Sequence, residues 1–91
     1  MSRHYIETRS PAIVVAVGWE GCLNAGEGGF FAQVSRYQND TEELMCTVLG
    51  EPDAYGSLDS IQRDIREYAI VPEYVRQILR DDRQLSRAGR Q

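Results

Sequence analysis

Cys22, one of two cysteines in this chain, could support nucleophilic chemistry, because a cysteine thiolate can attack carbonyl or disulfide centres. Such a cysteine needs a base within reach and an environment that lowers its pKa. The only histidine, His4, lies in a separate predicted strand, and the neighbouring Glu20 and Glu27 would raise the pKa of a thiol rather than lower it. We therefore predict that Cys22 is not catalytic and that the chain is not an enzyme. A small hydrolase or transferase that uses Cys22 is the weakest of the three functions considered below.

A glycine-rich segment surrounds this cysteine and could suggest a phosphate-binding loop. Such a loop opens a helix, whose N-terminus then holds the anion. Here the segment leads into the strand-like residues 30–35, carries two glutamates and contains no lysine. The pattern predicts a long hairpin connection over residues 20–29, and no cofactor.

Three acidic residues near the middle of the chain, Asp40, Glu42 and Glu43, are close enough in sequence to bind a hard cation. The regular oxygen ligands of an EF-hand loop are not present around them, and two separated cysteines with one histidine do not form a zinc set. We expect a solvated turn and no metal. The sequence shows no signal peptide and no apolar run of membrane-spanning length, so we expect a cytoplasmic protein with reduced thiols and no membrane partner.

The elements that must position these residues follow from the periodicity of the apolar residues. Alternating apolar and aromatic residues predict four strands, over residues 4–9, 12–19, 30–35 and 44–49. From Ser57 the period changes to that of a helix, and Pro72 suits the first position of a second helix. The sequence therefore predicts an α+β fold, a four-stranded antiparallel meander followed by two C-terminal helices packed on one face. Residues 1–82 form the single domain, and residues 83–91 form a frayed tail.

The predicted core lies between one face of this sheet and the helices. Strand and helix periods direct six apolar residues to one seam: Ile13, Val15, Val17, Ile61, Ile65 and Ile78. Without helices on the second face, Val14, Ala16 and one of the two phenylalanines at 30 and 31 are left near water or a partner. Trp19 is either part of the core or an exposed anchor for a partner.

Acidic residues are concentrated in the middle of the chain, where residues 20–59 hold eight acids against Arg36. A negative field of this kind repels nucleic acid and favours basic partners, although it can also serve solubility alone. A meander predicts two clusters at opposite ends of the third strand. The candidate partner-binding residues are Trp19 together with Glu20, Glu27, Glu51 and Asp53 in one cluster and Asp40, Glu42 and Glu43 in the other.

The step Gly18-Trp19-Glu20 followed by Phe30-Phe31-Ala32-Gln33-Val34 resembles a set of small uncharacterised bacterial proteins of plasmids, phages and integrative elements. These share a Gly-Trp-acidic step, a short loop with proline and leucine, and Phe-Phe. The later step Val71-Pro72-Glu73 is also similar. This chain differs in the loop, which is longer and has Cys22 where a proline is expected. Small acidic proteins of mobile elements include anti-CRISPR inhibitors, and the resemblance implies that class.

Two functions remain open besides the enzyme. The first is a non-enzymatic interaction protein of mobile-element type, whose acidic residues block a basic nucleic-acid-binding surface of a host protein, such as a nucleic-acid-targeting defence complex. It would not bind nucleic acid directly. The second is a homodimeric module that buries the apolar second face of its sheet against itself.

Overall fold

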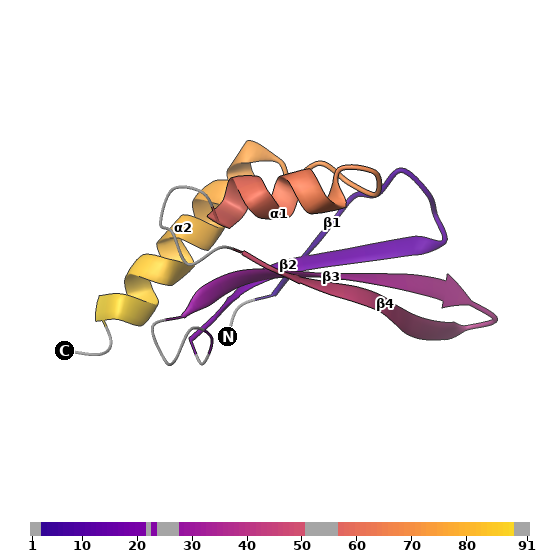
Figure 1. Ribbon diagram of the computed structural model, residues 1–91, viewed down its shortest axis with the longest axis horizontal. Helices are drawn as coiled ribbons and strands as arrows, with labels where there is room; N and C mark the ends of the chain where they lie inside the picture. The colour runs from indigo at the N-terminus through magenta and orange to yellow at the C-terminus, as the bar shows by residue number, and fades with distance from the viewer. Residues whose placement is uncertain (1–2, 22, 24–27, 51–56, 89–91) are drawn as a thin grey trace.

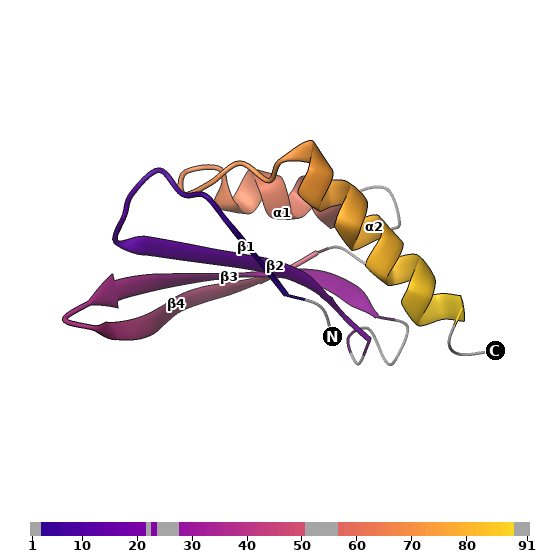
Figure 2. The same cartoon turned by 180° about the vertical axis from the view of Figure 1, so that it is seen from behind.

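The chain folds as one antiparallel sheet backed by two helices. A computed structural model describes residues 3–21, 23, 28–50 and 57–88. The elements along the chain are β1 (His4–Ile6), β2 (Ile13–Glu20), β3 (Gly29–Gln38), β4 (Thr41–Leu49), α1 (Ser57–Ile65) and α2 (Glu73–Ala88). The strands follow the order β1-β2-β3-β4 in the sheet, and both helices lie on the same side of it (Figures 1 and 2). The predicted α+β meander with two C-terminal helices is confirmed.

The long hairpin of β2 and β3 forms the centre of the sheet. Its register runs from Ile13 opposite Arg36 to Glu20 opposite Gly29, so the glycine-rich segment joins two strands as predicted. The loop is closed by a hydrogen bond in which the Gly28 amide donates to the Leu23 carbonyl, at 2.8 Å. Both neighbours of this hairpin, β1 and β4, are therefore edge strands.

The β3–β4 hairpin turns within two residues and contains an irregularity. Asn39 and Asp40 both have positive φ, 54° and 61°, as a tight two-residue hairpin turn requires. Val34 pairs with Cys46 but the next residue, Ser35, pairs with Leu44, so Met45 is an extra residue in β4. This bulge reverses the alternation of side chains between the two halves of β4.

The hydrophobic core lies between the helices and the sheet face that carries Val15, Val17 and Val34. Ile61 and Ile65 of α1 are buried against it, as predicted, and Ile13 is partly buried at its edge. The connection before α2 contributes the buried residues Ala69 and Val71, and α2 itself contributes Val75 and Leu79. Val75 and Leu79 are four residues apart and form a narrow apolar stripe on one side of α2, which Val71 continues before the helix begins.

Ile78 was the incorrect member of the predicted core, since its side chain is 38% exposed. Three residues after Val75, it lies on the flank of the stripe rather than on its centre line. The helix also extends further than expected, because α2 continues to Ala88 whereas the apolar period predicted fraying after Asp82. Asp82 itself is half-buried and its carboxylate lies 3.0 Å from Nε2 of His4 in β1.

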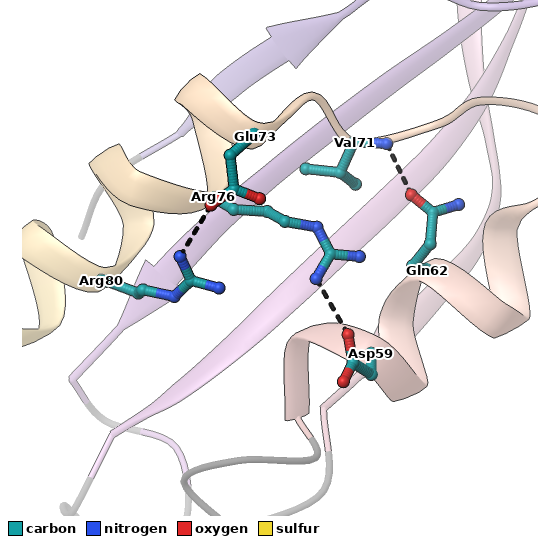
Figure 3. A network of polar contacts seen from close by, with 6 residues as sticks. All are labelled: Asp59, Gln62, Val71, Glu73, Arg76 and Arg80. Atoms are coloured by element: carbon teal, nitrogen blue, oxygen red, sulfur yellow. Dashed lines mark hydrogen bonds and ion pairs between the residues drawn. The ribbon is translucent and has the colours of Figure 1, made fainter.

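A polar network joins the two helices (Figure 3). The Gln62 side chain spans their connection: its amide donates to the Ala69 carbonyl at 3.1 Å, and its carbonyl accepts from the Val71 amide at 2.6 Å. Arg76 of α2 donates to the Asp59 carboxylate of α1 at 2.9 Å. These contacts fix the angle of α2 against α1, and therefore which residues of α2 reach the core.

Candidate interaction surface

The sheet face opposite the helices, here called the open face, carries large apolar side chains. Alternation along the strands places Ala16, Phe31 and their cross-strand neighbours on this face. Its side chains from β1 to β4 are Tyr5, Val14, Ala16, Glu20, Phe31, Gln33, Ser35, Tyr37, Glu42, Leu44, Thr47 and Leu49. Neither helix covers them (Figures 1 and 2).

The open face is mostly buried on its two central strands and exposed on its edge strands and at the tip of the β3–β4 hairpin. Phe31 is only 6% exposed, although no helix covers it, because its strand neighbours surround it. By contrast Tyr5, Tyr37, Leu44 and Leu49 are all exposed. Leu44 belongs to this face because the bulge at Met45 shifts its side chain across the sheet.

A shallow hollow of about 190 Å³ lies at one end of the open face. Its lining consists of Arg3, Glu20, Leu23, Phe31, Gln33, Thr47 and Leu49. Arg3 is held beside β1 by a 3.3 Å hydrogen bond from Nε to the Tyr5 hydroxyl, and its guanidinium lies 5.7 Å from the centroid of the Tyr5 ring. The hollow is thus mainly apolar, with one positive and one negative residue in its wall.

Trp19 does not belong to this surface. Its side chain is 5% exposed and packs edge-to-face on Phe30, with ring centroids 4.9 Å apart. The Arg83 guanidinium lies 5.9 Å from the Trp19 ring centroid. The expectation of an exposed aromatic anchor is therefore wrong for Trp19, and the alternative of a core tryptophan is confirmed.

The structure describes some residues of the predicted acidic clusters and not others. Glu20 lies at the hollow, while Glu27, Glu51 and Asp53 lie outside the described residues, as does Cys22. Asp40, Glu42 and Glu43 are all exposed at the tip of the β3–β4 hairpin. Glu42 pairs with Tyr37 on the open face, and Glu43 pairs with Arg36 on the opposite face. The residues of the second cluster therefore lie together at one end of the sheet, but Glu42 and Glu43 are on opposite faces of it.

The described part of the chain was also searched for reactive thiols, metal ligands and groups with a shifted pKa. Cys46 is an exposed free thiol in β4, and no group of three potential metal ligands occurs among the described residues. The charge of Glu67 raises the pKa of Tyr68 above its ordinary value. No helix in the described ranges is long and apolar enough to cross a membrane.

Sequence reasoning did not find two other surface features. One is an exposed apolar flank of α2, formed by Tyr74, Ile78 and Leu85, which a helical wheel centred on Val75 and Leu79 could have found. The other is a hollow of about 490 Å³ between the β1–β2 and α1–α2 connections, lined by Arg9, Ile70, Tyr74 and their neighbours. Its polar and charged lining residues are exposed or half-exposed, so they do not define a site for a specific ligand.

The fold and this surface define a small α+β protein whose sheet is covered on one face only. A comparison with protein-family models, curated proteins and solved structures finds no match to this chain.

Proposed function

We propose that this chain is a non-enzymatic protein-interaction module that binds its partner through the open face. The observation that carries the proposal is a sheet face that no helix covers and on which the large side chains of Tyr5, Tyr37, Leu44 and Leu49 are exposed. Large apolar side chains that gather on one uncovered face are typical of binding sites. Tyrosines at the margin suit an interface, because each combines an apolar ring with a polar hydroxyl.

The dimensions of the hollow favour a protein partner over a small molecule. Sites for drug-sized ligands and cofactors usually occupy roughly 300–1,000 Å³ and enclose most of the ligand. The hollow at Phe31 and Leu49 has about 190 Å³, which suits one side chain projecting from a partner. Side chains seated in such pockets contribute a large share of interface energy.

Two matched leucine substitutions test this proposal. Leu49→Asp places a charge on the open face, and Leu85→Asp places the same charge on α2; the two side chains are 58% and 71% exposed. We expect Leu49→Asp to abolish the partners captured by the parent from its own cells, and Leu85→Asp to retain them, with unchanged circular dichroism. Partners retained equally by both variants would contradict the proposal.

A second candidate is an inhibitor of mobile-element type, comparable to anti-CRISPR proteins, that blocks a basic nucleic-acid-binding surface of a host protein. It is favoured by the exposed acids Asp40, Glu42 and Glu43, since the hairpin that carries them extends beyond α1 (Figure 1). Their negative field would attract arginine- and lysine-rich surfaces and repel nucleic acid.

Charge reversal at the hairpin tip tests this candidate. Glu42→Lys combined with Glu43→Lys should slow association with a basic partner strongly, because the charges steer the encounter. Glu7→Lys combined with Glu67→Lys changes the net charge equally at exposed sites elsewhere and is the control. Equal association rates for the two double variants, measured by surface plasmon resonance, would rule this candidate out.

A further inference from the structure

We propose that the partner of the open face contributes an extended segment, which adds to the sheet as a further strand beside β4. This inference rests on the proposed function, since it names the kind of partner that the same surface binds. Two features meet at one end of β4 and carry it: an unprotected stretch of sheet edge and the hollow beside Leu49. Strand addition needs both, because backbone hydrogen bonds give affinity and a pocket for side chains gives specificity.

β4 is the long exposed edge of the sheet. It has nine residues, whereas the other edge strand, β1, has three. Edge strands are usually protected from further pairing by their shortness, by charged side chains, by proline or by a bulge. In β4 the protective features all lie in the first half, which carries Glu42, Glu43 and the bulge at Met45. Residues 46–49, all of which the structure describes, have neither charge, proline nor bulge.

The backbone of this second half presents hydrogen-bonding groups to the outside of the sheet. The Gly50 amide donates to the Phe30 carbonyl at 3.0 Å, so the backbone groups of Gly50 point toward β3. These groups point in alternate directions along a paired strand, and those of Leu49 and Thr47 therefore point away from β3. Among the described residues no strand lies beyond β4, so the sheet leaves these groups without a ladder partner.

Side-chain direction connects this edge to the hollow. Thr47 and Leu49 are the β4 residues that line the hollow, and the Leu49 side chain is 58% exposed. A residue of the added strand directly opposite either of them places its side chain on the open face as well. An apolar side chain at that position packs on Leu49 and reaches the hollow, while its two chain neighbours point to the other face. The segment that fits this edge is therefore apolar at alternate positions.

Charge defines the other end of the segment. Glu42 is exposed on the open face opposite Tyr37, and Tyr37 is six residues along β3 from Phe31, roughly 20 Å from the hollow at the rise of an extended strand. A lysine or arginine of the segment at that distance can pair with Glu42. Antiparallel strand pairs are slightly more stable than parallel ones, so we place the basic residue after the apolar residues in the segment.

Peptide selection supplies the probe for testing this inference. Random peptides of about twelve residues, displayed on phage, are long enough to reach from the hollow to Glu42. Selection on the immobilised chain should enrich alternating apolar residues followed by lysine or arginine. The most enriched peptide is then synthesised with a fluorescent label, and its affinity is measured by fluorescence polarisation. If no enriched peptide loses its binding in Leu49→Asp, the inference is overturned.

N-methylation of that peptide tests strand pairing directly, without any change in the protein. Each peptide amide N–H is replaced in turn by an N-methyl group. Only alternate amides of an added strand face β4, so methylation at every second position should weaken binding by at least about tenfold, and methylation between them should have little effect. A uniform effect, or none, would overturn strand addition, because a contact made by side chains alone does not distinguish the two sets of amides.

Two substitutions at one position test the protein side of the ladder. Thr47→Pro removes the outward amide N–H of β4 and keeps the pairing with β3, since proline is tolerated where a strand N–H faces outward. Thr47→Ala keeps that N–H and is the matched control. We expect Thr47→Pro to weaken peptide binding at least about tenfold and Thr47→Ala no more than about threefold, with circular dichroism showing that both fold. Equal affinities would overturn the inference; if Thr47→Pro does not fold, the N-methyl series decides.

The inference and the proposed function can fail separately. If Leu49→Asp releases the peptide but neither N-methylation nor Thr47→Pro weakens it, the open face binds through side chains alone and only strand addition is wrong. If the chain self-associates in sedimentation velocity and Thr47→Pro abolishes this, a second copy occupies the edge, which also overturns the inference. If neither captured partners nor selected peptides are lost in Leu49→Asp, both proposals are wrong.

Discussion

At the scale of single residues, the tightest constraint in the described chain is the contact of Gly28 with the Trp19 ring. Gly28 has a φ of 91°, a conformation that side chains rarely adopt. A Cβ atom placed there would overlap with the Cζ2 atom of Trp19. Glycine is therefore required at this position for two independent reasons, the backbone conformation and the buried indole beside it.

Gly28→Ala should consequently lower the free energy of unfolding by at least about 2 kcal/mol, through the positive φ and the overlap together. Denaturant unfolding followed by circular dichroism measures this loss. Trp19→Phe removes the ring atoms that overlap, so Gly28→Ala should cost less in that background. The difference should be about 1 kcal/mol or more, a coupling typical of residues in direct contact. Equal costs in both backgrounds would show that backbone strain alone demands the glycine.

At the scale of elements, the connection between α1 and α2 depends on one side chain. Gln62 satisfies the Ala69 carbonyl and the Val71 amide, which are both in the part-buried turn between the helices. Gln62→Met keeps the length of the side chain but removes both hydrogen bonds, and should cost about 1–3 kcal/mol, since buried backbone groups lose their partners. The control is Gln77→Met on the exposed side of α2, which should change stability by less than about 0.5 kcal/mol. Equal thermal unfolding of the two variants would contradict the role given to Gln62.

The packing of α1 against the sheet gives a second prediction. Ile65 is fully buried, whereas Ile70, five residues later, is mostly exposed. Ile65→Ala should therefore cost about 2–4 kcal/mol in denaturant unfolding, from lost burial and the cavity left behind. Ile70→Ala should have a small effect, because its side chain gains little from folding. A loss below about half a kilocalorie for Ile65→Ala would show that α1 does not pack as described.

Most elements of this fold could be predicted from the sequence because the spacing of apolar residues that identifies each one lies within a short stretch of the chain. The alternation in β2 and the spacing of Ile61 and Ile65 each identify one buried face without further knowledge. The buried face of the second helix was harder to predict, since Val75, Ile78 and Leu79 fit a helical stripe equally well on sequence alone. The crossing angle fixed by Gln62 and Arg76 decides between them, and it leaves Ile78 on the flank.

The candidate surface was less predictable than the fold. Alternation along the third strand predicted that either Phe30 or Phe31 faces away from the helices, and in the structure that residue is Phe31. The hollow, however, depends on the register that sets Phe31 opposite Leu49, which no local pattern reveals. The position of Leu44 depends on the bulge at Met45. Strict alternation would place Leu44 on the helix side of the sheet, because a shift of one residue exchanges the faces.

At the scale of the whole molecule, the two proposed modes of binding respond differently to salt. A complex formed by the hairpin-tip acids should weaken steeply as the Debye length falls from about 10 Å at 0.1 M salt to about 3 Å at 1 M. A complex formed by the open face is mainly apolar and should change only a few-fold, through Arg3 and Glu42 at its margin. Titration calorimetry across this range distinguishes them. A steep salt dependence that disappears in Glu42→Lys combined with Glu43→Lys would identify the hairpin tip as the binding site.

The order of the elements along the chain also has a consequence for biosynthesis. All four strands precede both helices, and each strand pairs with its neighbour in sequence, so the sheet can assemble while the chain is still being made. About thirty residues separate Leu49 from Leu79, the last helical residue in the core, and their synthesis takes roughly two to six seconds at the usual rates. During that interval a nascent chain that still lacks α2 therefore exposes apolar residues on both faces of its sheet.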